Sequence, residues 1–228
     1  MFYILTNMNS RNDFLTAIQS DWTPENVSGL ISTLNSAYRA VLDRTNPDQD
    51  PLYDTPNLPL VRGYLRWAFV DSHLARACEI GVIKGIEPIW VDLTDRGSGI
   101  MALELTGKHT SLMAHHLQNP DDPPRYSELR YDRRVQNWSN PMLPGFSADE
   151  PKNGLIHLTL IHGDKDAEFA FLRIYNNPDE LKTYTPASGN IMENPAIDIA
   201  ATETEQVDEP EIGLRENTDT KRKKAQNE

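Results

Sequence analysis

The spacing of apolar residues changes abruptly near 81–85, and this change limits the folds open to the chain. Before it, apolar residues recur every three or four positions, which is the period of an α-helix. After it, short apolar runs are bounded by turn residues, as in β-strands. Helices come first and strands follow, which argues against a doubly wound parallel sheet. The sequence therefore predicts an α+β fold, with N-terminal helices packed on a mostly antiparallel sheet.

Two long helices are predicted in the first third of the chain. The first begins at the Thr-Pro-Glu sequence of 23–25, where a capping hydroxyl, a first-turn proline and an acid favour a helix start. The second spans 60–80 and stops at Gly81. Its first half is apolar nearly all round, which predicts burial on several sides. Four prolines make the connecting segment 46–59 irregular.

Several strands are predicted after the helices. The segments 86–93 and 100–106 form a hairpin around a glycine turn, and 109–117 fits either a strand or a short helix. The runs 155–161 and 169–175 are apolar on both faces, which is typical of strands near the middle of a sheet.

The remaining segments complete the predicted organisation. The segment 119–150, rich in Pro, Asp, Asn and Arg, is too long for an idle loop, so it is either functional or partly flexible. From 186 on, aromatic residues are scarce and polar ones abundant, which predicts a disordered acidic tail. The chain is thus divided into a helical N-terminal region (1–48), a connector (49–59), an α+β core (60–185) and the tail (186–228).

Charge and cysteine content restrict the classes of function. The net charge is −12, and 187–228 holds ten acidic and five basic residues, so the rest of the chain is also acidic. An acidic core repels nucleic-acid phosphates on average, unless a local basic patch overrides it. The single cysteine, Cys78, excludes an intramolecular disulfide and favours a cytoplasmic location. The sequence shows no signal peptide and no apolar run long enough to span a bilayer, so no membrane association is expected.

Three groups of residues are candidate sites. The first is a histidine cluster in which His162 and Asp164, at the end of a predicted strand, combine with His116 or His115. Such a set could hold a divalent metal that activates water, although its spacing matches no established zinc pattern. His157 and His162 are five apart on one strand, so their side chains point to opposite faces. The alternative is that these histidines serve only the structure, and neither the metal nor any cofactor can be assigned.

The second group is a basic and aromatic stretch in 125–138. Arginines between aromatic rings can stack on bases and pair with phosphates, although neighbouring acids balance them here. The same residue types are common in protein interfaces. The candidate binding residues are Arg125, Tyr126, Arg130, Tyr131, Arg134 and Trp138, with Arg133 between them.

The third candidate is Asp71, which shares a helix stripe with Trp67 and Leu74. A carboxylate on an apolar face needs a partner, so we expect a structural ion pair or hydrogen bond rather than a general acid or base.

These observations favour a non-enzymatic interaction or regulatory module whose partner is another protein. A metal-dependent hydrolase or nuclease and a nucleic-acid binder acting through 125–138 are the alternatives. The interaction hypothesis predicts an exposed apolar or aromatic patch.

Overall fold

A computed structural model of the chain describes residues 7–92, 101–124, 127–140, 143, 154–163, 167–177, 180, 182–195 and 197, with side chains from Phe14 on. Within these residues it contains four α-helices, one 3₁₀ turn and a six-stranded sheet, which confirms the α+β class. In chain order the elements are α1 (Asn7–Asp21), α2 (Pro24–Arg44), η1 (Pro51–Tyr53), α3 (Leu58–Glu79), β1 (Glu87–Asp92), β2 (Met101–Thr106), β3 (Thr110–Leu117), α4 (Glu128–Trp138), β4 (Ile156–Gly163), β5 (Phe169–Ile174) and β6 (Thr185–Pro186).

The predicted start and stop signals of the long helices are confirmed. The Thr23 hydroxyl accepts a hydrogen bond from the backbone N–H of Asn26 at 3.3 Å, and Pro24 begins α2. After α3, Gly81 has a φ of +75°, a left-handed conformation that glycine adopts without strain.

The sheet has the strand order β1-β2-β3-β4-β5-β6, and every neighbouring pair is antiparallel except β3 and β4. Parallel neighbours need a crossover connection, usually a helix. Here the crossover contains α4, which lies within the segment 119–150 that the sequence indicated as an irregular region. The helix was not predicted, because the segment around it is rich in Pro, Asp, Asn and Arg, as loops are.

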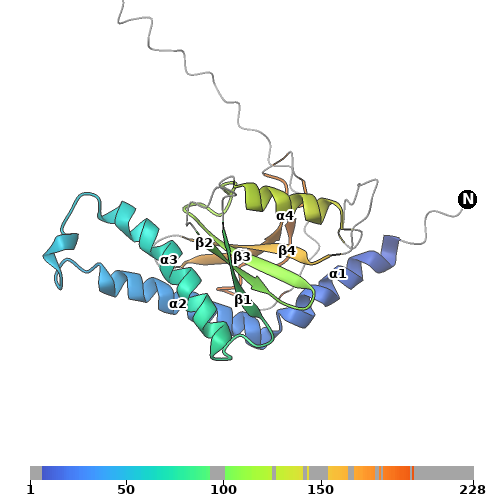
Figure 1. The fold of residues 1–228 in the computed structure, drawn as a ribbon, viewed down its shortest axis with the longest axis horizontal. Helices are drawn as coiled ribbons and strands as arrows, with labels where there is room; N and C mark the ends of the chain where they lie inside the picture. The colour runs from blue at the N-terminus through green and yellow to red at the C-terminus, as the bar shows by residue number, and fades with distance from the viewer. Residues whose placement is uncertain are drawn as a thin grey trace, which may run out of the picture.

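The two faces of the sheet have different chemistry. Helices α1, α2 and α3 cover one face and α4 covers the other (Figure 1). On the first face, α2 and α3 bury an apolar core against alternate residues of the central strands, among them Leu30, Leu34, Leu74, Leu105, Leu112, Ile156, Leu160 and Leu172. Polar side chains dominate under α4.

The first half of α3 differs from the prediction of burial on several sides. Leu60, Tyr64 and Trp67 are 62%, 67% and 40% exposed. The reason is visible in Figure 1, where α2 and α3 form an antiparallel hairpin whose distal part, with η1 at its tip, projects beyond the sheet. We call the projecting part of this hairpin, residues 42–67, the arm. Apolar residues in the arm lack a sheet to pack against.

The described residues after 185 also differ from the predicted tail boundary. The side chains of Ala187, Ile191 and Ile197 are buried in the main core. The backbone N–H of Ala187 donates to the carbonyl of Leu172 at 2.8 Å. The ordered core therefore extends to Ile197, and most of the predicted tail lies outside the described residues.

Candidate functional site

Helix α4 turns polar side chains to the sheet and leaves apolar side chains exposed to solvent at two positions. Arg134 and Asn137 are buried, whereas Tyr131 and Val135 are each 37% exposed. This is the reverse of the usual arrangement, in which a helix buries its apolar stripe. The Ser127 hydroxyl caps the helix by accepting from the Arg130 N–H at 3.3 Å. Buried arginine is costly without acceptors, so the layer beneath α4 must supply partners for it and is a candidate functional site.

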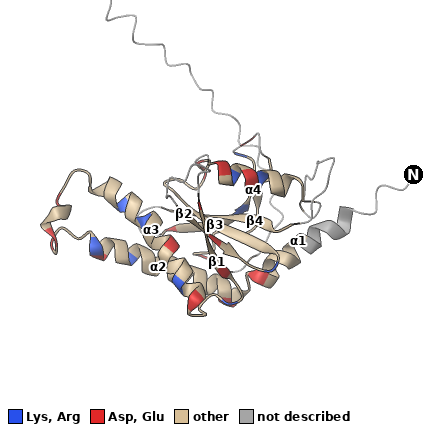
Figure 2. Cartoon of the chain, viewed as in Figure 1, with Lys and Arg blue, Asp and Glu red and all other residues tan. Residues whose placement is uncertain are grey.

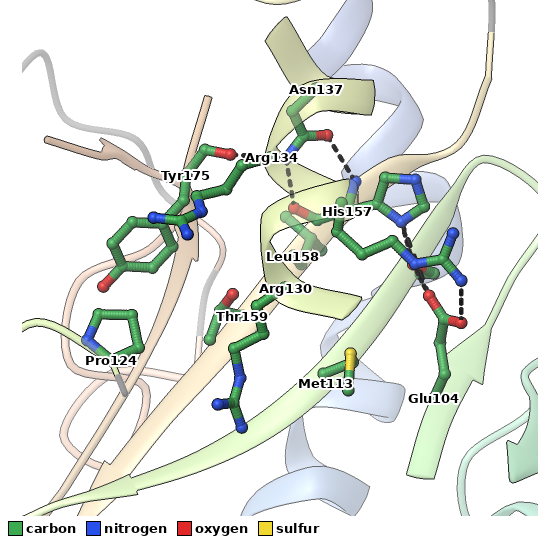
Figure 3. A pocket seen from close by; sticks show the side chains of 12 residues that line it. Glu104, Met113, Pro124, Arg130, Arg134, Asn137, His157, Leu158, Thr159 and Tyr175 are labelled. Carbon is green, nitrogen blue, oxygen red and sulfur yellow. Dashed lines mark hydrogen bonds and ion pairs between the residues drawn. The ribbon is translucent and has the colours of Figure 1, made fainter. Parts of the chain in front are cut away.

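A pocket lies between α4 and the sheet, and it is partly open to solvent (Figure 3). The free space at its centre is about 30 Å³, which holds roughly two or three water molecules. Most of the residues that line it have polar side chains, and all but Pro124 and Tyr175 come from β2, β3, α4 and β4: Glu104, Ser111, Met113, Pro124, Arg130, Arg133, Arg134, Asn137, His157, Leu158, Thr159 and Tyr175.

A chain of hydrogen bonds crosses one wall of this pocket. Ser111 Oγ donates to Glu104 Oε1 at 2.7 Å and lies 2.6 Å from His157 Nδ1. Arg133 Nη2 donates to the other oxygen, Glu104 Oε2, at 2.6 Å. Burial by itself raises the pKa of Glu104, but the bonds from His157 and Ser111 and the charge of Arg133 outweigh it, and the pKa falls to about 2.

The direction of these bonds defines the protonation of His157. Since the Ser111 proton points to the Glu104 carboxylate, His157 Nδ1 must donate to Ser111 Oγ. Burial lowers the pKa of His157 below its ordinary value, which keeps the ring neutral at neutral pH. In a serine hydrolase the histidine instead accepts the serine proton. The geometry is therefore not that of an activated serine nucleophile.

Asn137 ties α4 to the sheet where β4 and β5 separate. Its Nδ2 donates to the backbone carbonyls of His157 at 2.8 Å and Tyr175 at 3.1 Å, and its Oδ1 accepts from the His157 N–H at 2.9 Å (Figure 3). The β4–β5 ladder ends at the pair Thr159 and Arg173, so His157 has no ladder partner on that side. The side-chain amide replaces the missing strand and fixes the pocket wall.

Asp71 likewise bonds to an unpaired backbone group, here where β2 and β3 separate. The β2–β3 ladder begins at Glu104 and Met113, so Leu103 has no partner on β3. The buried carboxylate of Asp71 takes a hydrogen bond from the Leu103 backbone and interacts with the charge of Arg130. Burial raises the pKa of Asp71 to about 7, against the opposing effects of these two partners and of a hydrogen bond from the Trp67 side chain. The predicted hydrogen-bonding role of Asp71 is confirmed.

The predicted histidine cluster is only partly assembled. The parallel register places His116 beside His162, with ring centroids 5.8 Å apart. His115 lies on the other face of β3 and Asp164 is outside the described residues. Within the described part of the chain, no group of three or more His, Cys, Asp or Glu side chains is arranged to hold a metal ion.

His162 is buried in the core instead of opening to solvent. Its Nδ1 lies 2.9 Å from the Tyr38 hydroxyl of α2, and the two rings meet edge to face. Burial, followed by the nearby charges of His116, His115 and Arg66, lowers the pKa of His162 to about 3. A neutral, hydrogen-bonded histidine in the core fits a structural role. His157 and His162 point to opposite faces of β4, as expected.

The predicted basic and aromatic stretch is a helix with divided roles. Three arginines of the helix, Arg130, Arg133 and Arg134, line the pocket. Tyr131 is exposed, and the Arg134 guanidinium lies over its ring, 5.9 Å from the ring centre. Trp138 is half-buried at the end of α4. Arg125 and Tyr126 lie outside the described residues. The described arginines do not form the exposed basic face that base stacking would need.

A second candidate surface lies on the arm and at the adjacent edge of the sheet. Leu60, Tyr64 and Trp67 occupy successive turns of α3 at a spacing of four and three. Figure 2 shows basic residues spaced along the same hairpin. At the sheet edge, Ile89 and Trp90 of β1 are also largely exposed.

Sequence reasoning missed the pocket residues Glu104, Ser111 and Asn137. The only signal was the spacing of Arg130, Arg133, Arg134 and Asn137, which places all four on one helix face. Their partners lie on strands far away in the sequence, so the pairing could not be predicted from local spacing.

Comparisons with family models, curated proteins and solved structures give no match to this chain. No helix in the described residues has the length and apolar character to cross a membrane.

Proposed function

We propose that the protein is a non-enzymatic interaction module that binds a helix of a partner protein through the arm. The observation that carries this proposal is that one apolar stripe on α3 is buried at one end and exposed to solvent at the other. Its C-terminal part contains Leu74, which is buried against the core, and its N-terminal part contains Leu60 and Tyr64, which are exposed.

The residue types and their spacing support this proposal. Leucine, tyrosine and tryptophan at intervals of four and three form the ridge that packs into a groove of another helix. Tyrosine and tryptophan are also enriched among the residues that dominate binding energy. A helix of the partner, laid along α3, would continue the packing that the sheet gives to the other end of the same stripe.

The test is a photo-crosslinking and affinity experiment. A photoreactive phenylalanine analogue replaces Tyr64 in the full chain, with Ser36, an exposed polar residue of α2, as the control position. The expected result is crosslinking from position 64 to a helix of one partner. The purified partner should then bind the Leu60→Ser/Tyr64→Ser variant at least tenfold more weakly than wild type.

The matched control is Asn35→Ser/Ser36→Ala, which changes exposed polar residues of α2 and should bind like wild type. The proposal is wrong if the double variant retains full affinity, or if position 64 crosslinks only to a second copy of this chain.

Two alternatives have less support. A metal-dependent hydrolase would need His162 accessible, but its ring is hydrogen-bonded in the core. A nucleic-acid binder would need exposed arginines on 125–138, but Arg134 is 5% exposed. The sequence has a single cysteine, Cys78, so no intramolecular disulfide can form, which supports a reducing compartment such as the cytoplasm.

A further inference from the structure

Helix α3 contains a glycine, Gly63, that no contact within the described chain requires. A glycine inside a helix is less favourable than alanine, because it loses more backbone freedom on folding. The backbone of Gly63 is helical and lacks the positive φ that makes glycine necessary at Gly81. A Cβ atom at Gly63 would meet no heavy atom within 4 Å beyond its chain neighbours and the surrounding helix backbone. The free protein therefore has room for a side chain at this position.

The other glycine in the described helices, Gly29 of α2, shows what a packing reason looks like. Its Cβ would lie 2.8 Å from the backbone oxygen of Val82 and 3.3 Å from the Ile83 side chain, so a larger residue would clash. Gly29 is thus explained by close packing inside the chain. The same reasoning explains Gly63 by close packing against another molecule.

Gly63 belongs to the helix row that packs on the sheet further along α3. Leu60, Gly63, Trp67, Val70 and Leu74 alternate at intervals of three and four, so they lie on one face of the helix. Val70 and Leu74 are buried in the core, whereas Leu60 and Trp67 are exposed. The row therefore continues the packed interface between α3 and the sheet into the arm.

Large side chains on either side of Gly63 make this position a notch. Leu60 precedes it by one turn, Trp67 follows it by one turn, and Tyr64 lies beside it on the same face. The Trp67 side chain donates a hydrogen bond to the buried carboxylate of Asp71, which fixes one wall of the notch before any partner binds. A rigid aromatic wall lowers the entropy cost of association.

We infer that the partner helix crosses α3 at Gly63 and places a bulky apolar side chain, such as leucine or phenylalanine, between Leu60 and Trp67. This inference rests on the proposed function, because it names the contact point within the same surface. Ridges of one helix pack into grooves of another, and a glycine in the groove lets the incoming side chain reach the α3 backbone. The contact offsets the cost of a glycine in the free helix.

The variant Gly63→Ala separates this role from a role in the free protein. Because alanine favours a helix and its methyl group meets open space, the variant should unfold at a higher urea concentration than wild type. The probe is the partner segment that crosslinks to position 64, made as a labelled peptide and titrated with the full chain by fluorescence anisotropy. Its affinity for Gly63→Ala should fall at least tenfold, and its affinity for Gly63→Leu should fall further.

The matched control is Gly154→Ala, which adds the same methyl group at an exposed glycine outside the arm with equally open surroundings. This variant should bind the peptide like wild type. Weaker binding by a more stable Gly63→Ala variant supports the inference, since a gain in helix stability alone does not weaken binding.

The failure of this inference can be distinguished from the failure of the proposed function. Wild-type affinity in Gly63→Ala, together with weakened binding in Leu60→Ser/Tyr64→Ser, would overturn the crossing point and leave the interaction surface in place. Lower stability of Gly63→Ala than of wild type would also overturn it, because the glycine would then serve the free chain. Wild-type affinity in Leu60→Ser/Tyr64→Ser, or crosslinking only to a second copy of this chain, would remove both proposals.

Discussion

At the scale of single residues, two polar side chains form hydrogen bonds with backbone groups that lose their partners where neighbouring strands separate. Asn137 bonds to the backbone of His157 and Tyr175 at the end of the β4–β5 ladder. Asp71 bonds to the backbone of Leu103 at the end of the β2–β3 ladder. An unpaired backbone group inside a protein costs about 1–3 kcal/mol, so each side chain offsets a defect of that size.

Asp71 should make the stability of the protein depend on pH. Burial raises its pKa to about 7 in the folded state, well above the value of about 3.9 in an unfolded chain. Between these values the folded state binds more protons, so the contribution of Asp71 to stability falls as pH rises from about 4 to about 7. Asn at this position does not titrate.

We therefore expect the stability of Asp71→Asn, relative to wild type, to increase by about 2–4 kcal/mol between pH 4 and pH 7 and to level off above that. Urea unfolding at several pH values measures this difference. Ser72→Ala, an exposed and uncharged neighbour, should show a constant offset from wild type. A constant offset for Asp71→Asn as well would show that the carboxyl is not perturbed.

The need of Asp71 for a partner could be predicted from its place on an apolar stripe. The identity of that partner could not, because the Leu103 backbone becomes available only where β2 leaves β3. Asn137 gave no comparable signal, since an asparagine near a helix end is common and its partners lie 20 and 38 positions away. Burial of a carboxylate can be inferred from a pattern, whereas strand divergence is a property of the assembled sheet.

At the scale of elements, α3 shows one sequence pattern in two environments. Its apolar stripe runs from Leu60 to Leu74, with Asp71 within it, but only the C-terminal part meets the sheet. Helical periodicity predicted the helix correctly and predicted the burial of its first half wrongly. A period tells which residues share a face, and it does not tell whether another element reaches that face.

Substitutions at the two ends of this stripe should have unequal effects. Leu74→Ala removes a buried side chain and should lower the free energy of unfolding by about 3 kcal/mol. Leu60→Ala changes an exposed residue and should alter it by no more than about 0.5 kcal/mol. Chemical denaturation of both variants measures the contrast, and similar losses would show that the arm is packed in solution.

Helix α4 departs from the usual relation between pattern and burial in the opposite direction. Its arginines and Asn137 face the sheet while Val135 faces solvent. The strands beneath it supply polar side chains, so the polar face of α4 meets a polar layer. The sequence did not indicate this helix, because 119–150 is rich in Pro, Asp, Asn and Arg, a composition typical of loops.

At the scale of the whole molecule, the fold depends on segments that are distant in the sequence. The parallel pair β3 and β4 is joined by a crossover of 38 residues, 118–155, and β6 returns to the edge beside β5. The segment after β6 then closes one end of the core, where Ile191 is fully buried. The C-terminal part of the described chain therefore belongs to the folding unit.

Truncation tests this closure. A chain of residues 1–184 loses the buried isoleucines Ile191 and Ile197 and should be at least about 4 kcal/mol less stable than a chain of residues 1–197, at roughly 2 kcal/mol for each. Thermal and urea unfolding compare the two. Ile191→Ala within 1–197 is the control for a local effect and should cost about 2–4 kcal/mol. Equal stability of both chains would restore the predicted boundary at 186.

The sequence by itself determined the order of helices and strands, the helix caps, the mostly antiparallel sheet and the opposite orientations of His157 and His162. These features depend on neighbouring residues and on the two backbone periods, which are local. Only the tertiary structure decided which stripe is covered, where strands diverge, and which charges share the pocket under α4. Those properties arise from contacts between segments far apart in the chain, and a local pattern carries no record of them.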